Sequence, residues 1–309
     1  MQKVYWHLPG FCSLFKLNRT LIQLMKQYPE KFKEGYEIGS VYGTFPGAIW
    51  NGGRAVFGSI SRKDIKLILE MYNEVDIPVR FTWTNSLLEE KHLNDTFCNM
   101  IMELADNGKN QVLVNRQVLE DYLKATYGYI PVTPESSYAD YLNGFKKYDK
   151  GFAFISSTTK RLTGLEDVKK ELEKDFALVV LDYDLNCNEE ALKELEPYAG
   201  RIEILVDEIC FPNCPKRKHH YADESLMQLT FDRDQRYDCP NTKIHPSFAE
   251  SMKRPHFISN EKINSYIDRG FVNFKLIGRG LPVDMVVDSY LYYLVKEEHR
   301  DFIKDRLTK

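Results

Sequence analysis

Two cysteines stand at the end of a strand-like run in the stretch RIEILVDEICFPNCPKRKHHY, residues 201–221. Cys210 and Cys214 are separated by three residues, and a dense basic run follows them. Two thiolates on one short segment can share a metal ion or a cluster. Neighbouring cations favour the thiolate, which is the form that ligates metals and acts as a nucleophile. The stretch therefore predicts a metal site or a reactive thiol, and two reduced thiols without a ligand are the remaining alternative.

Further cysteines could complete a metal site. Cys239 lies later in the same polar stretch, within RYDCPN, and three cysteines in such a stretch are not expected to fill the core. An iron–sulfur cluster of the 4Fe–4S type takes four thiolate ligands. Cys187 follows the preceding strand-like run, and Cys12 follows the first one. We predict that the cluster ligands are Cys210, Cys214, Cys239 and Cys187, with Cys12 as the alternative to Cys187.

A structural zinc site is the main alternative to the cluster. It would combine the three cysteines of the polar stretch with His219 or His220, although the spacing departs from the close Cys pairs of zinc ribbons and fingers. A catalytic cysteine would need a neighbouring base, which either histidine could supply. The radical-SAM loop requires a third cysteine where this sequence has Arg217, so that chemistry is rejected for this loop. Cys98 lies in a helix-like run, TFCNMIM, and is expected in the core.

Polar side chains at the ends of the expected strands form a second group of candidates. In parallel barrels the reactive groups lie at the carboxyl ends of the strands. We predict that an anionic group is bound by Lys275, Arg279 and Arg217. We predict that protons are handled by Asp207 or Glu208, since a carboxyl at a partly buried strand end can have a raised pKa. The turn WNGGR could add to this group, although a plain glycine turn explains it equally well.

Strand-like and helix-like runs alternate along the chain from about residue 35. The expected strands are residues 3–8, 37–45, 79–85, 111–115, 152–158, 177–182, 201–208 and 273–279. The expected helices are residues 62–75, 93–108, 116–128, 165–175, 189–200, 260–270 and 284–307. This alternation implies βαβ units around a parallel sheet, and about eight strands close a TIM-like (β/α)8 barrel. We predict one α/β domain over residues 1–309, regular or irregular. An open doubly wound sheet is the alternative, but no Gly-rich dinucleotide turn follows any strand.

Residues 209–259 interrupt the alternation after a late strand. The stretch is rich in Cys, Pro, His and charge and shows no regular elements of its own. A long excursion of this kind inside a compact domain is usually functional. We therefore expect it to lie at the mouth of the barrel, together with the predicted metal ligands.

Composition limits the partners and the compartment. The 309 residues include 42 basic and 45 acidic ones, a net charge of −3, so no global field favours nucleic acid or an anionic membrane. A nucleic-acid substrate stays open only through the local basic run CPKRKHH. No apolar run of about 18 residues and no signal peptide occur, which predicts a cytoplasmic protein with reduced thiols and no membrane partner.

Three parts of the sequence resemble one family. EILVDEICFPNCPKRKHHY, DCPN and PHFISNEKINSYIDRGFVNFKLIGRG look like the core of the collagenase-like peptidase family of bacteria. That family also contains oxygen-independent ubiquinone-hydroxylation accessory proteins and tRNA and rRNA hydroxylation proteins. The run FKLIGR resembles the family's Lys-Ile-Glu-Gly-Arg strand: Lys275 and Arg279 match it, and Ile277 stands where the family commonly has Glu. The resemblance covers roughly residues 177–295.

The resemblance implies a TIM-like barrel and, in several members, an iron–sulfur cluster held by four cysteines. It carries over Cys210, Cys214 and Cys239 as ligands by position. Our first hypothesis is therefore an enzyme or enzyme subunit that uses a Cys-ligated metal centre in a redox or hydroxylation-type modification. A non-catalytic barrel with structural zinc that binds a ligand or partner is the second, and a metal-independent hydrolase or peptidase is the third. The substrate, small or macromolecular, and any partner subunit stay open.

Overall fold

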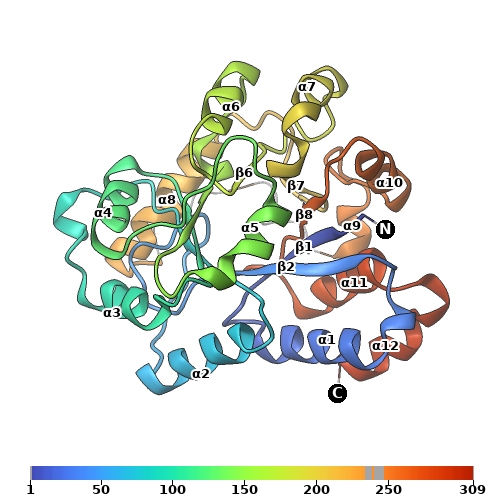
Figure 1. Cartoon of the computed structure of the whole chain (residues 1–309), viewed down its shortest axis with the longest axis horizontal. Helices are drawn as coiled ribbons and strands as arrows, with labels where there is room; N and C mark the ends of the chain where they lie inside the picture. Colours follow the sequence, from blue (N-terminus) through green and yellow to red (C-terminus); the bar gives the residue numbers. More distant parts are fainter. Residues whose placement is uncertain (1, 234–238, 240–246, 309) are drawn as a thin grey trace.

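A closed parallel barrel forms the centre of the protein. The computed structural model describes residues 2–233, 239 and 247–308. Within these residues eight strands pair in chain order, and β1 pairs with β8 to close the ring (Figure 1). The strands are β1 (Val4–Pro9), β2 (Tyr36–Gly43), β3 (Val79–Trp83), β4 (Gln111–Val114), β5 (Ala153–Ser156), β6 (Leu178–Val180), β7 (Ile202–Leu205) and β8 (Asn273–Lys275). Each expected strand overlaps one of them, so the predicted TIM-like (β/α)8 barrel is confirmed.

Helices surround the barrel (Figure 1). They are α1 (Phe15–Gln27), α2 (Arg62–Asn73), α3 (Thr96–Ala105), α4 (Gln117–Tyr127), α5 (Tyr138–Gly144), α6 (Leu165–Leu172), α7 (Glu189–Leu195), α8 (Arg217–Thr230), α9 (Phe248–Ser251), α10 (Asn260–Asp268), α11 (Val283–Leu294) and α12 (Arg300–Leu307). The last expected helix is divided into α11 and α12 because Val295 is extended and forms a bridge with Phe32. In the described ranges no helix is both long enough and apolar enough to cross a membrane.

Large apolar side chains fill the space between the barrel and the helices. Trp6, Trp50 and Trp83 are fully buried, and Phe81 stacks on Trp83 with ring centroids 5.2 Å apart. Burying one large apolar side chain contributes about 1.5–3 kcal/mol. Cys98, on α3, is also fully buried, as expected for a core residue. The abundant aromatic residues therefore serve packing in large part.

The interior of the barrel contains a layer of charged and polar side chains. Arg80 on β3 forms an ion pair with Glu203 on β7, and its Nε donates to Oε1 of Gln111 at 2.8 Å. Nζ of Lys275 lies 3.1 Å from the other carboxylate oxygen of Glu203. Burial lowers the pKa of His7 to about 3, so the neutral ring can accept a hydrogen bond from Nη2 of Arg80, 3.1 Å from its Nδ1. These buried charges are costly to desolvate, and their mutual pairing offsets that cost.

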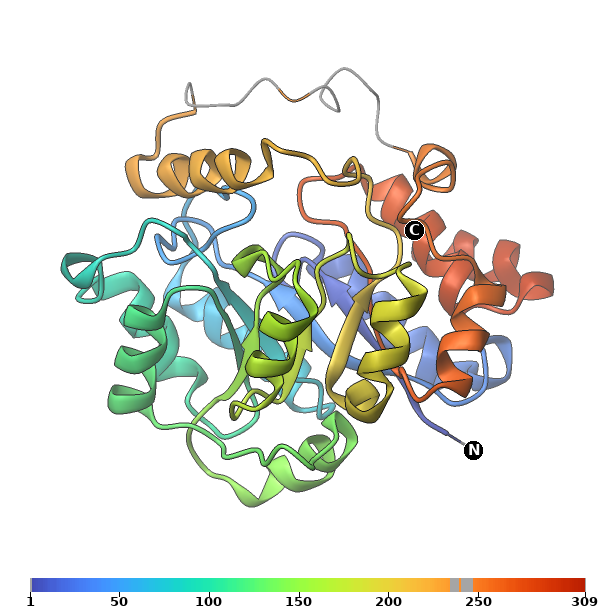
Figure 2. The same ribbon diagram turned by 90° about the horizontal axis from the view of Figure 1, so that it is seen from above.

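Residues 209–259 contain a long helix that the sequence pattern does not predict. Helix α8 lies across the carboxyl end of the barrel (Figure 2). The amides of Ala55 and Val56 donate to Glu224 and Gln228, each at 2.6 Å. The expectation of an excursion without regular elements is therefore wrong for α8. The physical reason is that the buried face of α8 is mainly polar, so the helix lacks the apolar periodicity by which a helix is recognised.

Candidate functional site

Two cavities open at the carboxyl end of the barrel, and residues of α8 border both. The larger has a volume of about 520 Å³ and the smaller about 130 Å³. Glu208, Cys210 and Arg279 belong to the walls of both cavities. The cavities thus lie where barrels of this type carry their reactive groups.

Arg279 places a positive charge on the wall shared by the two cavities. It follows β8, and its Nη1 donates to Oδ1 of Asn51 at 3.0 Å and to Oγ1 of Thr82 at 2.9 Å. Its Nη2 donates to the carbonyl of Gly52 at 3.2 Å. None of these acceptors carries a charge, so the contacts orient the guanidinium without neutralising it. An oriented guanidinium is suited to a carboxylate or phosphate group of a ligand.

The turn WNGGR positions this arginine, and it does so through a close backbone approach. A Cβ atom at Gly52 would lie 2.3 Å from the carbonyl carbon and oxygen of Thr84. A larger residue would therefore shift the turn that carries Asn51 and the Gly52 carbonyl. The turn is both a glycine turn and a contributor to the site.

Lys275 ends β8 and lines the smaller cavity while remaining only 4% exposed. Its Nζ lies 3.1 Å from Oε1 of Glu203 and 4.2 Å from the centroid of the Tyr42 ring. Burial, together with the nearby Arg80 and Arg279 cations, lowers the pKa of Lys275 to about 8, although Glu203 opposes the change. A substantial fraction of the side chains is therefore neutral at mildly alkaline pH.

The two acids that follow β7 have different surroundings. Asp207 is fully buried; its Oδ1 accepts from the amide of Ile277 at 2.8 Å and its Oδ2 from the hydroxyl of Ser289 at 2.7 Å. Burial raises the pKa of Asp207 to about 7. Glu208 lines both cavities, and one of its oxygens accepts from the amide of Cys210 at 2.9 Å. Of the two acids, Glu208 is the one placed to meet a ligand.

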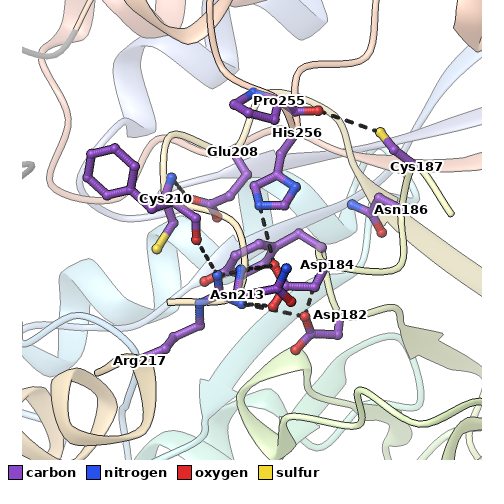
Figure 3. Close-up of polar contacts among 12 residues, drawn as sticks. Asp182, Asp184, Asn186, Cys187, Glu208, Cys210, Asn213, Arg217, Pro255 and His256 are labelled. Carbon is purple, nitrogen blue, oxygen red and sulfur yellow. Dashed lines mark hydrogen bonds and ion pairs between the residues drawn. The ribbon is translucent and has the colours of Figure 1, made fainter. Parts of the chain in front are cut away.

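The guanidinium of Arg217 is used inside the protein (Figure 3). It lies over the ring of Tyr183 with its Cζ 3.9 Å from the centroid. Its Nη1 contacts Asp184 at 2.7 Å, and its Nη2 donates to the carbonyl of Phe211 at 2.6 Å. His256 approaches the same Asp184, with Nε2 3.4 Å away. These contacts fasten the loop before α8 to the loop after β6, so we assign Arg217 to positioning; its role in binding an anion stays a prediction.

The predicted metal ligands are only partly brought together. Cys12, Cys210 and Cys239 line the larger cavity. Cys187 instead directs its sulfur toward the carbonyl of Pro255, 3.9 Å away, and not toward Cys210 (Figure 3). The alternative fourth ligand, Cys12, is therefore the one that shares a cavity with two predicted ligands.

The described residues do not form a ready metal site. Among them no group of three or more His, Cys, Asp or Glu could hold a metal ion, and Cys214 lies in the loop before α8 outside the walls of both cavities. Burial raises the pKa of Cys210, and Glu208 adds to the effect, against the opposing influence of Arg217. Arg217 thus favours the thiolate of Cys210, as expected of the basic run, but desolvation and Glu208 outweigh it. The residues as placed do not fit a four-thiolate cluster, and the cluster and the zinc site stay predictions.

Two further residues of the site went unrecognised in the sequence. Tyr42 is the last but one residue of β2, donates to the carbonyl of Leu276 at 2.6 Å and has the charges of Lys275 and Arg279 over its ring. Asp184 anchors the loop before α8. The rule that polar residues at strand ends form the site selects both positions, since each stands at or just after the end of a strand.

Known proteins share the fold and part of the sequence. No family model matches the chain. The solved structure of the U32 peptidase Mk0906 superimposes with a TM-score of 0.53 at 14% sequence identity, covering 91% of this chain and 94% of that one. The chain has a U32 peptidase-like fold. An uncharacterized protease, MJ1657, of Methanocaldococcus jannaschii is 28% identical over 128 residues.

Both likenesses are limited, one in the length that is matched and the other in sequence identity. The matched segment spans 38% of this chain and 37% of the length of the Methanocaldococcus jannaschii protein. The likeness to the solved structure, at 14% identity, shows the fold alone. Both relatives are named as peptidases, which agrees with the resemblance to the collagenase-like peptidase family. Neither likeness shows the activity of this protein.

Proposed function

We propose that the protein is an enzyme that binds the carboxylate of its substrate at Arg279 and acts on the bond held beside Glu208. The observation that carries this proposal is the Arg279 guanidinium, oriented by three neutral acceptors on the wall shared by both cavities. The carboxylate end of a substrate would supply the negative charge that the three acceptors of Arg279 lack. Glu208 faces the same space and can take a proton from an attacking water and return it to a leaving amine.

Hydrolysis of a short peptide next to its C-terminal carboxylate is the first reaction class to test. The names of the two relatives favour it, and the larger cavity, about 520 Å³, falls within the range of small-molecule sites. In this reaction water adds to the peptide carbonyl, the C–N bond breaks, and the proton passes to the departing nitrogen.

Replacing Arg279 by Gln is expected to weaken peptide binding about 10- to 100-fold, because one charge-assisted contact contributes about 1.5–3 kcal/mol. Binding and cleavage of acetylated tripeptides are measured by calorimetry and mass spectrometry. The same peptides as C-terminal amides are the matched ligands, and they should bind wild type and variant alike.

Arg62→Gln is the matched protein control, since Arg62 is exposed at the start of α2. It should leave both ligand series unchanged. If Arg279→Gln binds the free carboxylates as well as wild type does, the proposed site is wrong.

The second candidate is the iron–sulfur enzyme predicted from the sequence. One observation favours it: Cys12, Cys210 and Cys239 line the same cavity. Its chemistry would be redox, which zinc does not supply. The described cysteines are not gathered into a ligand set.

Anaerobic purification followed by iron, zinc and acid-labile sulfide analysis tests this candidate. Iron with sulfide should be present in wild type and lost in Cys12→Ser, whereas Cys187→Ser should retain it, because Cys187 points toward Pro255. Zinc without iron would support the structural alternative, and protein free of both metals would remove this candidate.

A further inference from the structure

Lys275 and Arg279 present two different groups to one small space. Nζ of Lys275 lies 4.2 Å from the centroid of the Tyr42 ring, and Cζ of Arg279 lies 5.9 Å from the same centroid. Both side chains belong to the wall of the smaller cavity. A guanidinium recognises a carboxylate, and an amine recognises a carbonyl carbon. A molecule that carries these two groups side by side matches the pair.

The surroundings of Lys275 favour a reactive amine over a permanent ammonium ion. Its partner Glu203 is shared, because the same carboxylate also pairs with Arg80. The side chain is held away from solvent, and cations stand near it on both sides, Arg80 inside the barrel and Arg279 at the cavity wall. Desolvated lysines next to other cations are the ones that act as nucleophiles in proteins.

We infer that Lys275 forms an imine with the ketone of a 2-oxo acid whose carboxylate is bound by Arg279. The inference rests on the proposed carboxylate site and adds a covalent role for a residue that the proposed hydrolysis does not use. The smaller cavity, about 130 Å³, has room for about four water molecules at about 30 Å³ each, so it suits only a short 2-oxo acid.

The step balances without an oxidant or a reductant. The neutral Nζ attacks the ketone carbon, a C–N bond forms, and the carbonyl electron pair moves to oxygen, which takes up a proton. The resulting carbinolamine loses its oxygen as water when the C–O bond breaks and the nitrogen lone pair forms the C=N bond. Both protons of the attacking amine leave with that water, so the net change from the neutral amine is one imine formed and one water released.

Borohydride trapping with pyruvate tests this inference directly. Sodium borohydride reduces an imine to a stable amine, and peptide mapping by mass spectrometry identifies the modified lysine. Lys275 should carry at least tenfold more adduct than the exposed Lys66, because Lys275 shares a cavity wall with the Arg279 guanidinium that holds the ligand's carboxylate, and Lys66 pairs with Glu70 at the surface. Lys275→Arg, which keeps a positive charge beside Glu203, should carry no adduct at this position.

The carboxylate dependence is tested with acetone, which has the ketone but no carboxylate. In wild type, pyruvate should label Lys275 well above acetone, and Arg279→Gln should reduce pyruvate labelling to the acetone level. Equal labelling of Lys275 and Lys66 in wild type would overturn the inference, and that outcome needs no variant to fold. Absence of an adduct together with intact carboxylate binding at Arg279 would also overturn it while leaving the proposed function in place.

Discussion

Glu203→Gln is expected to lower the free energy of unfolding by about 3–5 kcal/mol, because it removes the carboxylate that pairs with the buried Arg80 and Lys275. Arg80 would then remain inside the barrel with its charge uncompensated, and Lys275 would lose the anion that opposes its deprotonation. Urea unfolding followed by circular dichroism measures the change. Glu37→Gln is the control: Glu37 pairs with Lys3 at the surface, 46% exposed, and its loss should cost less than about 1 kcal/mol.

The pH dependence of the same pair gives a second measure. Burial alone would raise the pKa of Glu203, but the Arg80 and Lys275 cations outweigh it and hold the pKa well below the ordinary value of 4.5. The unfolded chain therefore binds the proton more readily, and stability falls as the pH drops below about 4.5. In Glu203→Gln this part of the acid sensitivity should be absent. A variant as stable as wild type and equally acid-sensitive would contradict the role of this ion network.

Asp207→Asn is expected to have the opposite effect and to stabilise the protein at alkaline pH. Burial holds the pKa of Asp207 at about 7, about three units above the ordinary 3.8. The folded protein therefore binds the proton more tightly, and stability is lost as the pH rises from about 4 to 7. The full difference corresponds to about 4 kcal/mol. An Asn can keep both contacts, accepting from the Ile277 amide and donating to the Ser289 hydroxyl.

Unfolding free energies of wild type and Asp207→Asn at pH 4.5, 6 and 8 give the measurement. The two proteins should be similar at the lowest pH, and the variant should gain as the pH rises. Asp288→Asn is the matched control, since Asp288 is an exposed residue on α11 paired with Lys304. A constant difference between wild type and Asp207→Asn at all three pH values would argue against a titrating carboxyl.

The barrel could be predicted from the sequence because its signal is local and repeated. Each strand is a short apolar run followed by a helical period, and the eightfold repetition leaves few alternatives. Helix α8 could not be found in this way, because Glu224, Ser225 and Gln228 form its buried face. Their partners are backbone and side-chain groups of loops far away in sequence, and a local pattern does not reveal such partners.

Only part of the candidate site could be predicted from the sequence, because a local pattern does not show which way a side chain faces or which partner it meets. Lys275, Arg279 and Glu208 line the cavities, as a rule about strand ends predicts. Asp207 precedes Glu208 by one residue and faces the other way, into the contacts of Ile277 and Ser289. Successive side chains of extended backbone alternate in direction, and the sequence does not show which of two adjacent acids faces the ligand. Arg217 lines the smaller cavity but pairs with Asp184, a partner contributed by another loop, and the sequence does not show that pairing.

The layer of ion pairs inside the barrel could not be predicted from the sequence either. His7, Arg80 and Glu203 stand among apolar residues in the runs VYWHL, VRFTW and RIEIL. A strand of a closed barrel packs on one face against side chains inside the barrel and on the other against the surrounding helices. The alternation of side chains along the strand therefore does not show which of the two faces a polar residue is on. Arg80 and Glu203 pair across 123 positions of sequence. The sequence shows the three polar residues, but it does not show that they contact one another inside the barrel.

Helix α8 lines the larger cavity, but it takes no part in the strand ladder of the barrel. Glu224 and Gln228 accept hydrogen bonds from Ala55 and Val56, in a loop, and Gln228 also accepts from Asn51; the ladder of the eight strands closes without these contacts. Substitutions of His220 or Asp223, on the side of α8 that lines the larger cavity, would therefore change the wall of that cavity while leaving the strand ladder in place.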